Sequence, residues 1–267
     1  MKTMLRKFVT LLLIALLVTV GGSLAFDSGG AYAGPPPALP GGSLEADQKF
    51  QPAMDYDKDG CYPTPAIGPD GTINPGLKMG GALNGHCRDE WDLNNTNAYS
   101  RSKCNNDWCA YMYGFYFEKD QSTVAGPGSA GHTHDWEHVV VWVHDNIPEW
   151  VAVSQHGKYF WRNRKDIPFD GTHAKVVYHF DGGKAGGLSH VFRHAKSNDG
   201  DEPPENHHGK WQYPTLVGWD YFPPGIRDKL VSANFGKASL DLKDGVFEKN
   251  IGSSDPKFGA KPSEVPF

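Results

Sequence analysis

The sequence predicts a mainly β protein built as a β-sandwich. Turn-forming residues are frequent, with 32 glycines and 20 prolines among 267 residues, and long stretches with helical periodicity are scarce. Runs rich in Val, Tyr, Phe and Trp recur instead, separated by clusters of Gly, Pro, Asn and Asp. Short aromatic and β-branched runs between turn residues are typical of the strands of a sandwich.

The chain begins with a segment that does not belong to this fold. A basic start precedes an apolar run at Phe8–Val20, which is too short for a comfortable membrane span. The small residues at Ala31–Ala33 then fit an A-x-A cleavage site. Residues 1–33 are therefore predicted to be a secretory signal peptide; an uncleaved N-terminal anchor is the alternative.

The rest of the chain is expected to form one domain. Residues 34–48 begin with "GPPPALPGG", which predicts a Pro/Gly linker. Residues 49–267 are enough chain for a single sizeable core. The net charge is −5 and no block of Lys and Arg occurs, so we expect no nucleic-acid partner.

The sequence predicts one helix and five strands. One helix is predicted at 223–236, where Pro224 stands near the first turn and Gly236 follows the end. Five strands are predicted from β-branched and aromatic runs, at Cys109–Phe117, Glu137–Val143, Trp150–Gln155, Ala174–Phe180 and Leu188–His194.

The four cysteines predict two disulfides, because an even number in an exported chain favours pairing. Three pairings are possible. We favour Cys61–Cys87 and Cys104–Cys109, the second of which would close the tight loop "CNNDWC". A zinc site built from the thiols is the alternative, although no C-x-x-C spacing occurs and the compartment is oxidising.

One short segment, "GHTHDWEH" at 131–138, concentrates histidines and carboxylates just before an apolar run. Such groups are costly to bury unless a cation lies among them. Alternation along a strand places Asp135 and Glu137 on one face. His132 directly follows the loop sequence "GPGSAG", so at this loop-to-strand junction it can turn toward them. Carboxylates with one imidazole suit Mg, Ca or Mn better than a tight zinc site.

Two other interpretations of this segment compete with a cation site. It could be a surface strand with solvated charges. It could also belong to a metallohydrolase, but in the pattern H-x-H-x-D-H the aspartate position holds Trp136 and the last histidine position holds Glu137. No G-x-S-x-G motif is present, and the chain lacks the long α/β alternation of amidohydrolases. Enzymatic activity is therefore not expected.

The segment "GHTHDWE" resembles the heptapeptide G-H-R-H-D-W-E of the necrosis- and ethylene-inducing peptide-like proteins, with Thr133 where Arg is usual. "AYMYGFYFEKDQ" (110–121), "GTHAKVVYHF" (171–180) and "LVGWDYFPPGIRDKL" (216–230) are similar to other segments of that family. The resemblance covers about residues 50–251, nearly the whole mature chain.

The resemblance implies a central antiparallel β-sandwich flanked by a few helices and long loops, related in shape to actinoporins and fungal lectins. It implies a secreted, monomeric cytolysin that needs a divalent cation and is not an enzyme. Such a toxin binds the sugar headgroup of glycosylinositol phosphorylceramide, a sphingolipid of the plant plasma membrane. It damages this host membrane, causes necrosis and triggers plant immunity. A non-lytic, lectin-like homologue is the alternative.

The resemblance also implies roles for single residues. His134 would orient the cation site, and His190 would support it or contact the headgroup. Ser189 stands where relatives often have an acid, and the loop 181–189 is glycine-rich without an aromatic residue, which bears on lytic potency. The implied metal ligands are Asp120, His132, Asp135 and Glu137.

Four cysteines and an acidic loop resemble the second type of this family. In "DYDKDG" the spacing of Asp55, Asp57 and Asp59 matches the first half of an EF-hand, but the twelfth position is Ala66 instead of Glu. We therefore expect a shorter, second calcium loop completed from elsewhere, with a solvated acidic turn as the alternative. Candidates to complete it are Asp89, Glu90 and Asp92.

Overall fold

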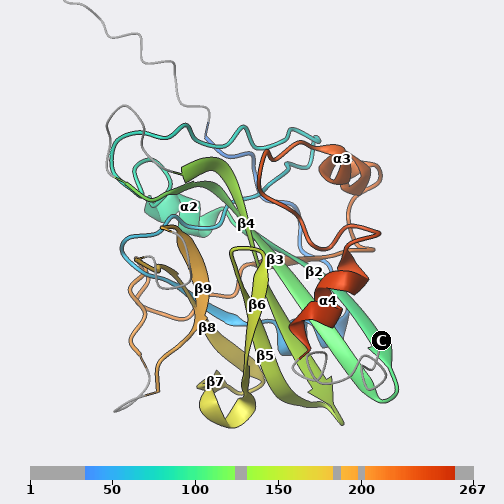
Figure 1. Cartoon of the computed structure of the whole chain (residues 1–267). Helices are drawn as coiled ribbons and strands as arrows, with labels where there is room; N and C mark the ends of the chain where they lie inside the picture. The colour runs from blue at the N-terminus through green and yellow to red at the C-terminus, as the bar shows by residue number, and fades with distance from the viewer. Residues whose placement is uncertain (1–33, 124–130, 183–187, 198–201, 256–267) are drawn as a thin grey trace, which may run out of the picture. The chain divides into compact units, whose positions relative to one another are not determined.

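Two β-sheets form the body of the protein in a computed structural model that describes residues 34–123, 131–182, 188–197 and 202–255 (Figure 1). The predicted signal peptide lies outside these ranges. In chain order the elements are α1 (Glu45–Phe50), β1 (Ala53–Tyr56), α2 (Glu90–Asn94), β2 (Asn97–Asn105), β3 (Trp108–Gln121), β4 (Gly131–His144), β5 (Ile147–Gln155), β6 (Lys158–Asn163), η1 (Arg164–Asp166), β7 (Phe169–Asp170), β8 (His173–Phe180), β9 (His190–His194), β10 (Thr215–Gly218), α3 (Ile226–Ser232) and α4 (Phe247–Ser254).

The larger sheet has the strand order β10-β2-β3-β4-β5-β6, and in the smaller sheet β8 pairs with β1, β7 and β9. The predicted mainly β sandwich is confirmed. Most pairings are antiparallel, but β1 runs parallel to β8 and β10 runs parallel to β2. The expected antiparallel pattern therefore holds for the central strands and not for these two pairs.

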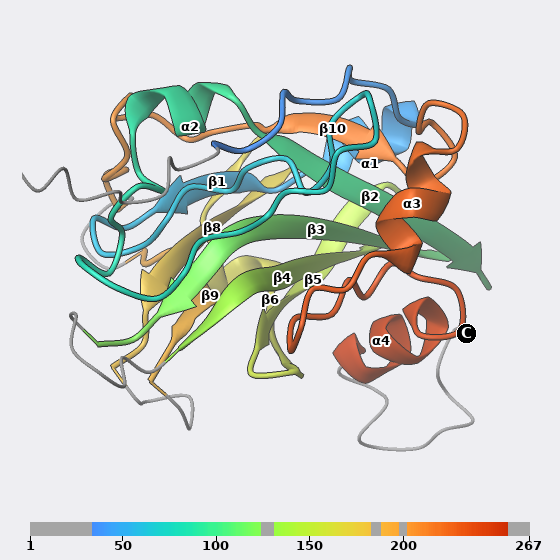
Figure 2. The same ribbon diagram turned by 90° about the horizontal axis from the view of Figure 1, so that it is seen from above.

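The central strands bury both of their faces. On one side of β3 and β4, residues such as Phe115 and Val139 pack against Tyr178 and Phe192 of the smaller sheet. On the other side, alternate residues such as Trp142 pack with Leu230, Phe247 and other residues of the C-terminal segment. Figure 2 shows α3 and α4 beside the large sheet, away from β8 and β9. The period-two pattern of the sequence thus builds a sandwich with a third, partly helical layer.

All five predicted strands are present, and the predicted helix is α3. The sequence analysis missed β1, β2, β6, β7 and β10, and also α1, α2 and α4. These elements are short or, like β2, rich in polar residues, so apolar periodicity gives little signal. Within the described ranges, no helix is long and apolar enough to cross a membrane.

The segment predicted as a linker packs onto the domain. Leu39 is only 1% exposed. The backbone N–H groups of Ala38 and Leu39 donate to the side chains of Asn95 and Asn97, each at 2.8 Å. The described part of this segment is irregular until α1, as its prolines predict, but its apolar side chains and bonded backbone fix it to the sheet.

Both favoured disulfides are present. Cys61 is bonded to Cys87 and Cys104 to Cys109. The second bond joins two directly opposed residues of the β2–β3 hairpin. All four sulfurs are paired, so no thiol remains for the alternative zinc site.

His194 makes the stability of the fold sensitive to acid. Its Nε2 donates to the carbonyl of Val151 at 2.9 Å, and burial lowers the pKa of His194 to about 4. Between pH 6.5 and pH 4 this ring is protonated in the unfolded chain but stays neutral in the folded chain. The free energy of unfolding should therefore fall on acidification, by roughly 3 kcal/mol from this group.

Chemical denaturation from pH 7 to pH 4 measures this effect. His194→Gln should flatten the dependence, whereas His144→Gln at a more exposed ring should leave the wild-type slope. Equal slopes in wild type and His194→Gln would refute the assignment.

Candidate cation site

A break in strand alternation brings the predicted residues together. β3 and β4 pair in one register, with Phe117 opposite Asp135 and Asp120 opposite His132, but the ladder is interrupted between Glu118 and His134. His134 has a left-handed φ of 63°, which is uncommon outside glycine. Beyond it, His132 lies within strand β4 and faces the same side as Asp135. The expected turn of His132 toward the carboxylates therefore comes from His134 and not from a preceding loop.

The four predicted metal ligands line one hollow of about 230 Å³, together with residues of β5, β9 and the segment 237–241. Asp120 comes from β3, and His132, Asp135 and Glu137 come from β4. The opposite walls are the β5–β6 turn and the segment 237–241. The three carboxylates are 2–7% exposed. Burial therefore makes the charged form of each one strongly unfavourable unless it is paired.

A hydrogen bond to the backbone orients the ring of His132. Its Nδ1 donates to the carbonyl of His134 at 2.7 Å, so the lone pair is on Nε2. Nε2 lies 3.9 Å from Oδ2 of Asp120. Two donors that share one cation at 2.0–2.6 Å stand about 3–4 Å apart. Asp120 and His132 therefore have a suitable separation.

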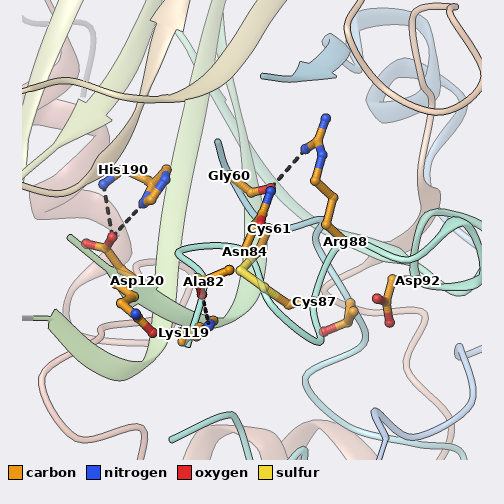
Figure 3. The surroundings of a disulfide bond; sticks show 12 residues. Gly60, Cys61, Ala82, Asn84, Cys87, Arg88, Asp92, Lys119, Asp120 and His190 are labelled. Carbon is orange, nitrogen blue, oxygen red and sulfur yellow. Dashed lines mark hydrogen bonds and ion pairs between the residues drawn. A yellow bond between two sulfur atoms is a disulfide. The ribbon is translucent and has the colours of Figure 1, made fainter. Parts of the chain in front are cut away.

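His190 on β9 holds Asp120 and is not itself a suitable ligand. Its backbone N–H and its Nδ1 donate to Oδ1 of Asp120, at 3.0 and 2.8 Å (Figure 3). Its Nε2 donates to the carbonyl of Asp59 at 3.1 Å. Burial opposes charge on the ring, but the hydrogen bond and charge of Asp120 raise the pKa of His190 overall. With both ring nitrogens donating, the ring has no lone pair for a metal.

The two carboxylates of β4, Asp135 and Glu137, have raised pKa values. Burial, and then the charge of Asp120, raise the pKa of Asp135 to about 7. Burial, and then the charge of Asp135, raise the pKa of Glu137 well above its ordinary value. Asp135 accepts a hydrogen bond from the Tyr178 hydroxyl at 3.2 Å, and Glu137 accepts one from Ser154. Such a cluster is relieved either by protons or by a cation.

The donor set fits a hard divalent cation such as Mg or Ca, because it offers carboxylate oxygens and one imidazole. Among the described residues, however, no three His, Cys, Asp or Glu side chains are already arranged so as to hold a metal ion. The carboxylates of Asp135 and Glu137 are bonded instead to Tyr178 and Ser154.

His134 points away from the carboxylates. Its Nδ1 hydrogen-bonds the Tyr116 hydroxyl at 2.6 Å, and its ring lies 5.3 Å from that of Phe235. It therefore acts on the site through the backbone. Ser154 and Tyr178 were missed by the sequence analysis. The one signal was that a buried tyrosine needs a partner for its hydroxyl.

The three carboxylates of the acidic loop do not converge. The Asp55 carboxylate accepts hydrogen bonds from the backbone N–H of Glu205 and from the side chain of Asn206. Asp57 forms an ion pair with Arg193. The Asp59 carboxylate accepts a hydrogen bond from the backbone N–H of Phe180. The residues expected to complete a calcium loop belong to α2 and its N-terminus, where Asp89 and Asp92 form a capping box.

The sequence profile of the Necrosis inducing protein (NPP1) family matches residues 44–254. The chain belongs to this family. "Necrosis-inducing protein NPP1" of Phytophthora nicotianae is 33% identical over 216 residues, which are 79% of this chain and 82% of that protein.

Solved structures of the necrosis-inducing family share the fold. One, described as "Toxin fold as basis for microbial attack and plant defense", has a TM-score of 0.67 and 27% identity, over 82% of this chain and 96% of the other. Another, "NLPPya in complex with mannosamine", has a TM-score of 0.66 and 28% identity over the same shares. The relatives and solved structures are described as necrosis-inducing proteins, effectors and a toxin fold.

Proposed function

We propose that this necrosis-inducing protein is a secreted, monomeric cytolysin that recognises the sugar headgroup of a plant plasma-membrane sphingolipid, glycosylinositol phosphorylceramide, through a divalent cation. Binding damages the membrane, and the damage causes necrosis and triggers plant immunity. The observation that carries this proposal is the convergence of Asp120, His132, Asp135 and Glu137 in one hollow.

The chain's own residues have distinct parts in this proposal. A bound divalent cation would neutralise the buried carboxylates and leave coordination positions for sugar hydroxyls. Asp120 is held by His190, which keeps Oδ2 turned toward His132. Lys237, Ser239 and His156 line the walls of the hollow and offer hydrogen bonds to a headgroup. A sugar ligand for this fold is supported by the relative solved with mannosamine.

Dye leakage from vesicles tests the proposal. Vesicles that contain plant glycosylinositol phosphorylceramide should leak on addition of the protein with calcium, should stay intact with a chelator, and should leak again when calcium is restored in excess. Vesicles of phosphatidylcholine alone are the control and should not leak.

Co-sedimentation with the same vesicles separates binding from damage. Calcium-dependent binding without leakage would favour the non-lytic, lectin-like alternative. The specific observation behind this alternative is Ser189, which is next to His190 and lines the hollow, at a position where the family resemblance implies an acid. Leakage that a chelator leaves unchanged would reject the cation-dependent mechanism.

A further inference from the structure

An arginine forms an ion pair with the acidic turn, Asp55–Gly60. One guanidinium nitrogen of Arg193 lies 3.1 Å from Oδ2 of Asp57. The two terminal nitrogens also donate to the two carboxylate oxygens of Glu202, at 2.7 and 2.6 Å. The Arg193 side chain is 15% exposed. A fixed positive charge thus lies between the carboxylates of Asp57 and Glu202 and occupies the side chain of Asp57.

Other protein groups fix the same turn. The N–H of Gly60 donates to the carbonyl of Asp57 at 3.0 Å, and the N–H of Phe180 donates to Oδ1 of Asp59 at 3.2 Å. Arg88 donates to the carbonyl of Gly60 at 2.9 Å, beside the Cys61–Cys87 disulfide (Figure 3). The donor set therefore does not fit a calcium ion, since its oxygens point to separate protein partners.

The turn contacts His190, which lines the hollow. The carbonyl of Asp59 accepts the hydrogen bond from Nε2 of His190 at 3.1 Å. A Cβ at Gly60 would come within 2.9 Å of the Tyr178 ring and 3.5 Å of the His190 ring. Glycine thus allows the turn to approach this close. The other nitrogen of the His190 ring holds Asp120 at 2.8 Å, so the turn, His190 and Asp120 form a continuous series of contacts.

We propose that the acidic turn binds no calcium and instead, closed by Arg193, positions His190 against Asp120. Arg193 is a positioning residue in this arrangement: it acts on the cation site through Asp57, the turn and the Asp59 carbonyl. The expected effect on cation affinity rests on the proposed function of the hollow. The contact between Arg193 and the turn is independent of that function.

Isothermal titration of the full mature chain with calcium is the first test. The wild type should bind one ion, and Arg193→Met should weaken its affinity about tenfold, as expected when a group that orients a ligand is lost. Arg193→Lys should restore part of it. Arg101→Met is the matched control: Arg101 also pairs with a carboxylate, that of Asp244, and donates to the carbonyl of Leu242, but it lies outside the hollow. It should leave the affinity unchanged.

The ring ¹⁵N signals of His190 provide a second readout, measured without calcium. The Nε2 signal of His190, whose ring contacts the Asp59 carbonyl, should shift in Arg193→Met and should stay at its wild-type position in Arg101→Met. If Arg193→Met fails to fold, Asp57→Asn, which removes the partner charge but keeps the shape, replaces it. A wild type that binds no calcium would reject the proposed function, and the ring signals would still test the positioning.

Two results would overturn the inference. One is a second calcium ion per wild-type chain that is lost in Asp57→Asn. The other is an Arg193→Met protein whose calcium affinity and His190 ring signals both equal those of the wild type.

Discussion

Asp135→Ala is expected to abolish leakage of sphingolipid vesicles while the fold survives. Asp135 interacts with both other carboxylates, since the charge of Asp120 raises the pKa of Asp135 and the charge of Asp135 raises the pKa of Glu137. Removing it deprives a cation of one ligand, and a weakly held cation cannot present open positions to a sugar. The same change relieves repulsion among buried carboxylates, so the cost in stability should be only about 1–3 kcal/mol.

The measurement compares leakage and melting temperature in excess calcium. Asp135→Asn is the volume-conserving variant and should also be inactive. Asp228→Ala, which removes an exposed carboxylate on α3, is the control and should lyse as the wild type does. Full leakage by an Asp135→Ala protein that binds no calcium would contradict the cation-dependent mechanism.

Period-two alternation was sufficient to predict the core of the sandwich and part of the site. It placed Asp135 and Glu137 on one face of a strand, and the structure has them on that face together with Val139. The five predicted strands were those in which aromatic and β-branched residues dominate. The disulfide pairing also agrees, because the short loop between Cys104 and Cys109 is a hairpin.

Long-range contacts could not be predicted in this way. The motif D-x-D-x-D-G does not distinguish a turn that binds calcium from one that pairs with an arginine. The arginine here, Arg193, is 136 residues from Asp57 in the sequence. The left-handed φ of His134 has only a weak local signal: histidine is enriched in that conformation, but few non-glycine residues adopt it at all. It is imposed by tertiary contacts such as the Tyr116 hydroxyl.

Gly131→Ala should be among the most damaging small substitutions in the chain. Gly131 begins β4 with a φ of 139°, a conformation that side chains rarely adopt. A Cβ there would overlap the carbonyl oxygen of Asp120 and come within 2.9 Å of the Cα of Gln121. Both obstacles are backbone, so the β3–β4 pairing itself must shift. We expect a loss of roughly 3–5 kcal/mol.

Gly171→Ala is the matched control, because Gly171 also has a positive φ, of 62°, but no atom lies within 4 Å of the place that a Cβ would take. Strain alone should cost it about 1–2 kcal/mol. The difference between the two variants in chemical denaturation isolates the overlap with Asp120. Since Gly131 lies opposite Gln121 and next to the Asp120–His132 pair, a shift there also separates two of the proposed ligands. Gly131→Ala should therefore lose calcium affinity, and Gly171→Ala should keep it. Equal stability and equal affinity in the two variants would show that β3 and β4 do not pair up to Gly131, and the convergence of Asp120 with His132 would then lose its structural basis.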